Sequence, residues 1–401
     1  MWTTRTLGDI CDHVDGVIQT GPFGSQLHES DYVPDGVPVV MPKNILDGKI
    51  DTSDIAFISE ENANRLGRHK MAMGDIVYGR RGDIGRRGLI SERENGWFCG
   101  TGCLRVSLGD RVLDPRYLYY YLGQPSVVGW IANQAVGATM PNLNTGILRS
   151  VVIKYPRLLV QQRIASILSA YDDLIENNTR RITILEEMAQ MIYREWFVSF
   201  RFPGHENVRM VESEFGPIPE GWTATTLGNV LTLEYGKALK AEDRKSGPIP
   251  VYGSSGVVGQ HSEALANGPG VIVGRKGNVG SVFLCHSDFW VIDTAYYVRS
   301  DLSLYFLYFN LRTQNFLNND AAVPGLNRNQ AHSLPLIVPH IEQLCSFDRN
   351  AGPLLALKRC LELRNLKLRS TRDFLLPKLI SGEVPVEAAD EAAAELMEQI
   401  A

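Results

Sequence analysis

The chain repeats itself once, and this internal duplication limits its possible folds more than any other feature of the sequence. Similar blocks of residues occur in the same order in both halves, beginning at Trp2 and Trp222, Gly79 and Gly274, Tyr117 and Tyr305, and Pro141 and Pro324. The offset between matching blocks shrinks along the chain, as expected if loops of the second copy are shorter. A chain of 401 residues also exceeds one typical domain. We therefore expect two similar globular domains.

A long amphipathic helical pattern follows each copy. In the first pattern, seam positions recur at alternating spacings of four and three, which is a heptad repeat. These positions are Ile164, Leu168, Tyr171, Ile175, Asn178, Ile182, Leu185, Ala189, Ile192 and Trp196. Asn178 is the one polar member, of a type that can set the register of paired helices.

The second pattern keeps the phase of the first. Leu354, Leu361, Leu368 and Leu375 recur every seven residues, with Lys358, Asn365 and Arg372 at the other seam positions and Leu357 as a possible extension of the stripe. The matched phase favours packing of the two helices against each other. Two helices packed on separate cores is the alternative.

The remainder of each half mixes short runs rich in Val, Ile and Phe with glycine-rich turns, which predicts small twisted sheets and a few helices. We expect an α+β protein in which two similar mixed α/β domains are joined by two long helices. The predicted parts are domain 1 (1–156), helix 1 (157–201), a linker rich in Pro and Gly (202–220), domain 2 (221–339), helix 2 (340–382) and an acidic tail (383–401).

A basic glycine loop is the sharpest local signal for function. Its cations are Arg80, Arg81, Arg86 and Arg87, interleaved with glycines, and the second copy keeps only Arg275 and Lys276. Glycines let backbone N–H groups approach a phosphate, and arginine can bind a phosphate or a guanine edge with two hydrogen bonds. An exposed turn with solvated charges is the alternative. Recurrence in both copies favours nucleic-acid binding.

A second candidate loop begins near Thr20 and is followed by further polar residues. Its candidate base contacts are Thr20, Ser25, Gln26, Lys43 and Asn44, and the corresponding region of the second half offers Lys237, Lys240, Ser254 and Ser255. Amide side chains can recognise adenine, and lysine can recognise guanine. A purely structural turn is an equally good interpretation of this loop.

Signatures of enzymes are missing from the sequence. There is no nucleotide-binding P-loop, zinc-protease motif or nucleophile elbow. Asp114-Pro115-Arg116-Tyr117 resembles a methyltransferase motif only superficially, and a helix that starts at Pro115 explains it better. The six cysteines lack zinc-binding spacing, so we interpret them as buried free thiols and expect no metal.

Composition adds little about partners. The net charge of −5 is unusual for a DNA-binding protein, but the acidic tail accounts for it, and affinity depends on where cations cluster. No apolar run is long enough to cross a membrane and no secretory signal is visible, so cytoplasm is the expected location.

Several segments together resemble the specificity subunit of type I restriction–modification systems, and the resemblance covers nearly the whole chain. These segments are 20–27, the glycine–arginine loop, 196–204, 216–222 and 375–383. The resemblance implies two target-recognition domains, each reading one half of a bipartite site in double-stranded DNA. It also implies that the two helices form an antiparallel coiled coil, which spaces the domains and docks two methyltransferase subunits, with restriction subunits joining afterwards.

The resemblance further implies that the chain is not an enzyme and needs no cofactor. The methyl donor, ATP and Mg²⁺ would be used only by partner subunits. The acidic extension after Gly382 and the weaker basic loop of the second half depart from the family pattern. A protein-interaction scaffold that does not read DNA, and an enzyme with an unrecognised site, are the competing hypotheses.

Overall fold

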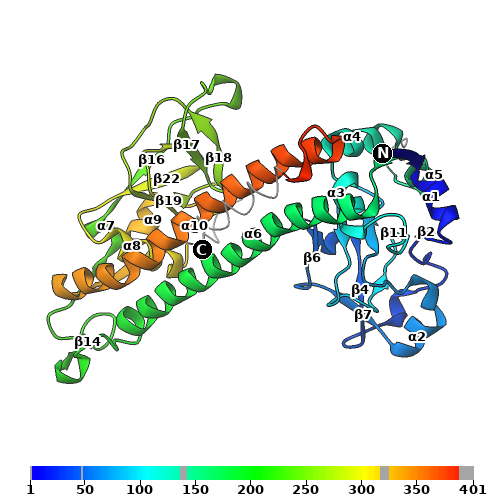
Figure 1. Ribbon diagram of the computed structural model, residues 1–401. Helices are drawn as coiled ribbons and strands as arrows, with labels where there is room; N and C mark the ends of the chain where they lie inside the picture. The colour runs from blue at the N-terminus through cyan, green and yellow to red at the C-terminus, as the bar shows by residue number, and fades with distance from the viewer. Residues whose placement is uncertain (1, 47, 136–141, 317–324, 388–401) are drawn as a thin grey trace. The chain divides into compact units, whose positions relative to one another are not determined.

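The computed structural model describes residues 2–46, 48–135, 142–316 and 325–387, which form two compact units. Unit 1 comprises Met1–Asn177 and Asn365–Ala401, and unit 2 comprises Asn178–Arg364. Each unit contains one α/β domain together with parts of two long helices (Figure 1).

The domain of unit 1 is built on two small sheets. One is antiparallel with the order β2-β11-β8-β9, formed by Val17–Thr20, Cys103–Ser107, Ile76–Gly79 and Arg87–Leu89. The other has the order β10-β4-β7-β3, formed by Phe98–Cys99, Val37–Val40, Ala56–Ile58 and Tyr32–Val33. Strand β10 runs parallel to β4. Two further strand pairs are β1 (Thr3–Thr6) with β12 (Val152–Tyr155) and β5 (Ile45–Leu46) with β6 (Lys49–Ile50).

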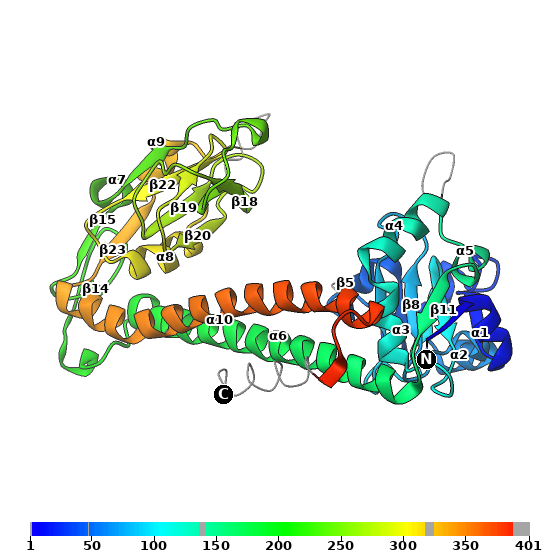
Figure 2. The same ribbon diagram turned by 45° about the horizontal axis from the view of Figure 1, so that its top comes forward.

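The described residues of this domain also form five short α-helices, and several of them lie around the sheets in Figure 2. They are α1 (Leu7–His13), α2 (Glu60–Arg65), α3 (Pro115–Leu122), α4 (Pro125–Gln134) and α5 (Thr145–Arg149). The carboxylate of Asp114 caps α3 by accepting from the backbone N–H groups of Arg116 and Tyr117, both at 3.0 Å. Pro115 is the first residue of α3, where its missing N–H costs nothing. The predicted helix start is therefore confirmed.

The domain of unit 2 repeats this topology. Its antiparallel sheet has the order β16-β22-β19-β20, formed by Thr232–Tyr235, Ala295–Arg299, Gly270–Gly274 and Val282–Cys285. The second sheet pairs β17 (Ile249–Gly253) with β18 (Gly256–His261) and, in parallel, with β21 (Trp290–Val291). The pair β15 (Thr223–Thr226) with β23 (Pro335–Val338) corresponds to β1 with β12. Its helices are α7 (Leu227–Val230), α8 (Leu304–Thr313) and α9 (Arg328–His332).

The predicted duplication is thus confirmed at the level of strand order and direction. The second domain has no counterpart of the β5–β6 hairpin or of α2 among its described residues. This difference accounts for the first decrease of the offset, between the blocks at Trp2 and Gly79, because the second copy omits these two segments.

Two long helices follow the domains. Helix α6 (Leu158–Tyr193) ends in a π-helical turn (Arg194–Val198), and α10 spans Ile341–Ser381. Between them a linker forms the small hairpin of β13 (Met210–Val211) and β14 (Ile218–Pro219). No described helix is long and apolar enough to cross a membrane.

In each unit the two helices run antiparallel, which confirms the predicted packing. In unit 1, Asp172 forms an ion pair with Arg372, and the amide of Asn365 donates to the carbonyl of Ile175 at 3.3 Å. In unit 2, Glu186 pairs with Lys358 at 2.6 Å, and the rings of Tyr193 and Phe347 lie 6.2 Å apart. The polar seam positions of α10 therefore have partners on α6.

Packing near the ends of the helices departs from the predicted seam. Tyr193 and Phe197 are buried, whereas the expected Ile192 and Trp196 are only partly buried. A straight α-helix drifts by roughly 20° per heptad relative to a 3.5-residue repeat, so the buried face turns. On α10, Leu355 and Leu376 are likewise buried more deeply than the predicted Leu354 and Leu375. Leu357 is 40% exposed, so the suggested widening of the stripe is wrong.

The cysteines follow the prediction only in part. Cys11, Cys99, Cys103 and Cys285 are buried free thiols, but Cys345 and Cys360 are exposed on α10. Helical spacing alone did not show that these two residues lie away from the packed face.

Candidate nucleic-acid interface

The glycine–arginine loop of the first domain is the hairpin that connects β8 to β9. Gly82 and Gly85 have φ values of 82° and 113°, a backbone region that L-residues with side chains rarely adopt. The carbonyl of Arg80 accepts from the Leu143 N–H at 2.8 Å, and Arg81 forms a β-bridge with Asn142. The loop is therefore fixed against the segment that precedes α5. Pro141, part of the repeated block, lies outside the described residues.

The four arginines of this loop have different roles. Arg80 donates from Nε to the Leu143 carbonyl at 3.2 Å. Arg87 donates from Nε to the Tyr119 carbonyl at 3.0 Å, with its guanidinium carbon 4.6 Å from the Tyr119 ring centre. These two side chains hold the loop in place.

Arg81 and Arg86 are the cations of the loop that are free to bind a ligand. Arg81 is exposed, and its side chain has no hydrogen-bond or ion-pair partner within the described part of the chain. Arg86 lies 3.6 Å from the carboxylate of Asp83, an exposed ion pair of little strength.

The second domain has the same loop with fewer charges. The carbonyl of Arg275 accepts from the Leu326 N–H at 2.8 Å, and Lys276 forms a β-bridge with Gly325, so these residues correspond to Arg80 and Arg81. Arg275 donates from Nη1 to the Asp293 carbonyl at 3.2 Å. Lys276 lies 3.6 Å from the Asp293 carboxylate, and both side chains are half exposed.

The polar residues around the second predicted loop do not form one cluster of free side chains. Thr20 and Ser25 lie at the surface, while the Gln26 side chain accepts from the Phe23 N–H at 3.3 Å. Lys43 forms an exposed ion pair with Asp54. Lys237 is exposed two residues after the end of β16.

Asn44 is a structural residue, contrary to the expectation that it reaches a base. It is only 2% exposed. Its side-chain oxygen accepts from the Met41 N–H at 3.0 Å, and its amide donates to the carbonyls of Asp51 and Asp54 at 3.2 and 3.3 Å. A buried amide with both ends satisfied holds the β5–β6 region together and has no atom left for DNA. The short-range sequence pattern gave no sign of this burial.

Two surface residues of the second domain were missed by the sequence analysis. Tyr235 is 46% exposed at the end of β16, and the guanidinium carbon of Arg328 lies 5.1 Å from its ring centre. No local motif marks either residue. Both border the glycine loop, because the guanidinium carbon of Arg275 in that loop lies 4.9 Å from the same Tyr235 ring centre.

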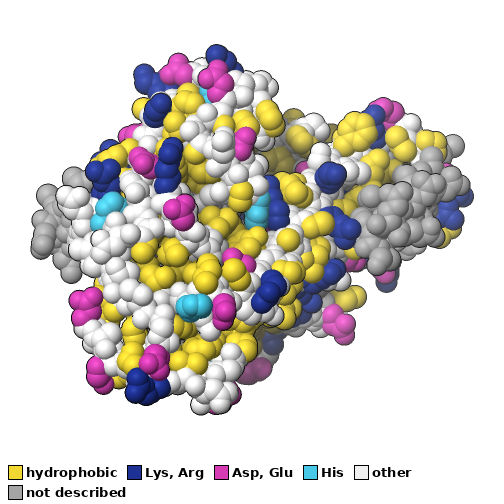
Figure 3. Space-filling model, turned by 90° about the vertical axis from the view of Figure 1, so that its left-hand side faces the viewer, with side chains coloured by type: hydrophobic (Ala, Val, Ile, Leu, Met, Phe, Trp, Pro, Cys, Tyr) yellow, Lys and Arg dark blue, Asp and Glu magenta, His cyan; other side chains and the backbone are white. Residues whose placement is uncertain are grey.

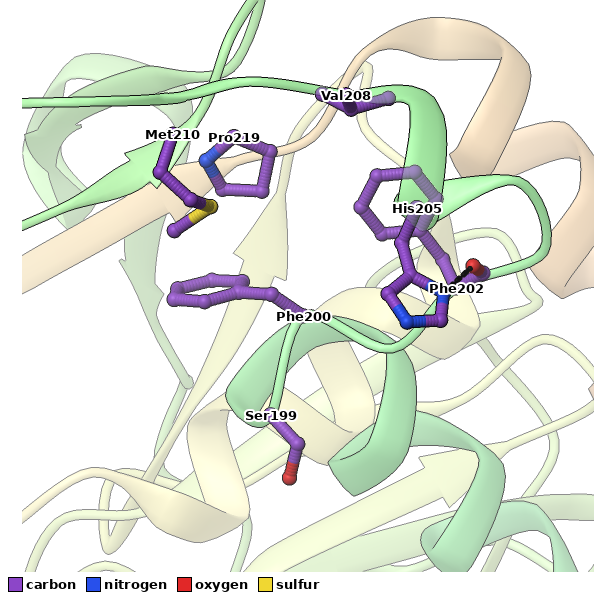
Figure 4. A pocket seen from close by; sticks show the side chains of 7 residues that line it. All are labelled: Ser199, Phe200, Phe202, His205, Val208, Met210 and Pro219. Carbon is purple, nitrogen blue, oxygen red and sulfur yellow. Dashed lines mark hydrogen bonds between the residues drawn. The ribbon is translucent and has the colours of Figure 1, made fainter.

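A hollow of about 230 Å³ lies elsewhere in unit 2, in the linker (Figure 4). It is lined by Ser199, Phe200, Phe202, His205, Val208, Met210 and Pro219. The His205 ring nitrogen Nδ1 is 2.8 Å from the Phe202 carbonyl oxygen, within hydrogen-bond distance. The lining is mostly apolar and carries no acid–base group besides this histidine. No group of His, Cys, Asp and Glu able to hold a metal ion occurs among the described residues.

Comparison with known families identifies this arrangement. A model of the type I restriction modification DNA specificity domain matches residues 1–187 and again 219–344, so both halves carry the same domain. The chain belongs to the family of type I restriction–modification specificity subunits. This membership accounts for the duplicated topology and for the pair of long helices.

Related specificity subunits occur in distant organisms. The chain is 28% identical over 359 residues to the MjaIX specificity subunit of Methanocaldococcus jannaschii, and the match covers 82% of each chain. It is 27% identical over 164 residues to the EcoBI specificity subunit of Escherichia coli, covering 40% of this chain and 32% of the relative. The crystal structure of the S subunit from M. genitalium has the same fold, with a TM-score of 0.58, 20% identity and coverage of 94% of this chain and 96% of that chain.

Proposed function

We propose that this specificity subunit reads a bipartite site in double-stranded DNA, with one half-site for each domain, and has no catalytic centre of its own. Methyl transfer and the reactions that need ATP and Mg²⁺ belong to methyltransferase and restriction subunits, which assemble on it in the cytoplasm. The observation that carries this proposal is the occurrence of one loop-bearing module twice, joined by two long paired helices. A duplicated reader suits two half-sites whose separation is set by the element between the readers.

The geometry of the glycine loops supports DNA contact in both domains. Each loop projects from the same hairpin of the same sheet and places a cation, Arg81 or Lys276, beside a left-handed glycine. Long cationic side chains on a turn that allows close backbone approach suit the phosphates and base edges of a groove. Arg80, Arg87 and Arg275 contribute by holding these loops in shape.

The long helices supply surfaces suited to methyltransferase subunits. On α6 within unit 2, Ile184, Met188 and Met191 are 53%, 45% and 63% exposed at spacings of four and three, which places them on one helix face. On α10 within unit 1, Leu366 and Phe374 are 59% and 62% exposed. Figure 3 shows broad areas of hydrophobic side chains on one side of the molecule. Large apolar side chains gathered on a surface indicate protein contacts.

The duplication relates these two surfaces to each other. Matching Leu368 and Leu375 to Leu185 and Ile192 places Phe374 at the position of Met191. Each unit therefore exposes one large apolar side chain at equivalent helix positions. Two equivalent docking surfaces fit the expected binding of two methyltransferase subunits.

The direct test is methylome sequencing of cells with and without this subunit, with the partner methyltransferase present in both. We expect one methylated bipartite motif that disappears when the subunit is deleted. Purified subunit in complex with its methyltransferase should also bind duplex DNA that contains this motif. A complex that assembles but binds no DNA at low salt contradicts the proposal and favours the scaffold hypothesis.

A further inference from the structure

The second glycine loop has too little free charge to bind DNA in the way that the first does. In the loop of the first domain, Arg81 and Arg86 are free to bind a ligand, whereas the loop of the second domain has only Arg275 and Lys276 as cations. One N–H of Arg275 is bound by the Asp293 carbonyl, and Lys276 pairs with the Asp293 carboxylate. The second loop would therefore need another cation nearby to bind DNA as strongly as the first loop.

Arg328 lies at the border of that loop. Asn327 caps α9 by accepting from the N–H groups of Asn329 and Gln330, and Arg328 is the first helical residue. The guanidinium carbon of Arg328 lies 5.1 Å from the Tyr235 ring centre, and that of Arg275 lies 4.9 Å from the same centre. Within the described ranges, no acceptor binds the guanidinium of Arg328.

Two guanidinium groups on one half-exposed tyrosine form a site that lacks an anion. The ring attracts each cation, but two like charges held beside one ring repel each other. The nearby Asp293 carboxylate already pairs with Lys276. An acceptor from a bound molecule would relieve the repulsion and use the free N–H groups of Arg328.

The first domain carries different residues at the corresponding places. Thr20 ends β2 opposite Leu104, as Tyr235 ends β16 opposite Tyr296, so the strand register makes Thr20 and Tyr235 equivalent. Thr145 follows the capping Asn144 as Arg328 follows the capping Asn327. The basic residue that the second loop lacks is thus present on α9, beside an aromatic residue that the first domain does not have.

We propose that Arg328, held in place by Tyr235, is a DNA-contacting residue of the second domain and replaces the loop arginines used by the first. This inference rests on the proposed function. The planar guanidinium can donate two hydrogen bonds, either to O6 and N7 of a guanine or to two oxygens of a phosphate. Contact with the Tyr235 ring restricts the movement of the guanidinium group, which lowers the entropy cost of either contact.

The test uses the full chain in complex with its methyltransferase and a duplex that carries its bipartite site. Arg328→Thr introduces the residue that the first domain has at this place. We expect binding about 10- to 100-fold weaker than that of the unaltered complex. Tyr235→Thr should weaken binding less, because the cation remains. Arg299→Thr is the matched control, since Arg299 is an exposed arginine 5.7 Å from the Tyr297 ring centre at the opposite end of β22, and it should leave binding unchanged.

Selection from a DNA library distinguishes the two kinds of contact. If Arg328 binds a guanine, both Arg328→Thr and Arg328→Lys relax one position of one half-site, because lysine lacks the two-pronged donor geometry. If it binds a phosphate, Arg328→Lys retains most of the affinity, and Arg328→Thr weakens all sequences equally and lowers the salt dependence by about one unit. Either result supports the proposal.

Unchanged affinity and selectivity in a folded Arg328→Thr complex would overturn it. Arg81 belongs to the first domain, so Arg328→Thr and Arg81→Ala should affect different half-sites. If both substitutions alter selectivity in the same half-site, the proposal is wrong as well. If the unaltered complex binds no specific DNA, the proposed function itself is wrong, and the two failures are thereby distinguished.

Discussion

The hydroxyl of Tyr120 donates a hydrogen bond to the carboxylate of Asp172 at 2.6 Å, and this contact joins the first domain to helix α6. The same carboxylate pairs with Arg372 on α10. In unit 2, Tyr308 donates to Glu186 at 2.8 Å, and Glu186 pairs with Lys358 on α10. Tyr120 and Tyr308 are equivalent in the duplication, although Asp172 and Glu186 are not. In each unit, an acidic residue of α6 thus bonds both to a tyrosine of the domain and to a basic residue of α10.

Tyr120→Phe should lower the free energy of unfolding by about 1–2 kcal/mol, because a hydrogen bond to a charged acceptor is lost. Urea denaturation of the purified subunit measures the change. Tyr155→Phe is the control, since the Tyr155 hydroxyl has no hydrogen-bond partner among the described residues, and it should cost less than about 0.5 kcal/mol. Equal effects of the two substitutions would show that the contact between Tyr120 and Asp172 does not stabilise the subunit.

Burial of His69 makes the stability of unit 1 depend on pH. Burial, with the positive charges of Arg68 and Arg105, lowers the pKa of His69 to about 4. The unfolded chain takes up this proton near pH 6.5, so stability is complete above that pH and falls as the pH drops towards 4. We expect a loss of about 1 kcal/mol per pH unit in this window. His69→Gln, which cannot titrate, should show a flatter profile when urea unfolding is compared at pH 7 and pH 5. Identical profiles would exclude His69 as the source.

Neighbouring loop arginines should respond differently to substitution. Arg81→Ala should weaken DNA binding by the methyltransferase complex by about 1–3 kcal/mol if Arg81 contacts a base, or lower the salt dependence by about one unit if it contacts a phosphate. The free energy of unfolding of the Arg81→Ala subunit should stay within about 0.5 kcal/mol of that of the unaltered subunit. Arg80→Ala, which removes the hydrogen bond to Leu143, should lower stability by about 1 kcal/mol. Binding titrations over a range of salt concentrations, with thermal unfolding, separate these effects. Normal DNA binding by Arg81→Ala would remove this residue from the interface.

The apolar surfaces of the helices should control assembly. Met191→Glu and Phe374→Glu should each prevent binding of one methyltransferase subunit, because a charge would be buried without a partner. Sedimentation analysis should then detect complexes with one methyltransferase, and with none when both substitutions are combined. Val257→Glu, at an exposed apolar residue of β18, should leave assembly intact. Full assembly of the doubly substituted subunit would place the docking surfaces elsewhere.

Sequence patterns predicted the features of this fold that depend on periodicity and repetition. The duplication, the seam from Ile164 to Ile175 and the start of α3 at Pro115 all follow from local residue choices, and the structure confirms them. The roles of single polar residues depend on tertiary neighbours instead. Asn44 is buried and Arg87 is held by Tyr119, and no short-range pattern reveals either contact.

The pair of Tyr235 and Arg328 is a second example of a tertiary contact that the sequence does not reveal. These residues are far apart in the sequence, and the first domain has threonines in their places. Comparison of the two halves by sequence similarity therefore gives no signal at these positions. Only the equivalent strand register brings the difference to light.

The central claim is that the paired helices set the distance between two DNA-reading domains. Inserting one heptad after Thr179 in α6 and another after Glu362 in α10 preserves the seam and lengthens each helix by roughly 10 Å, about three base pairs of DNA. Methylome sequencing of cells that carry this variant measures the gap between half-sites directly. We predict the same two half-sites separated by about three additional base pairs. An unchanged gap in an active variant would contradict the claim.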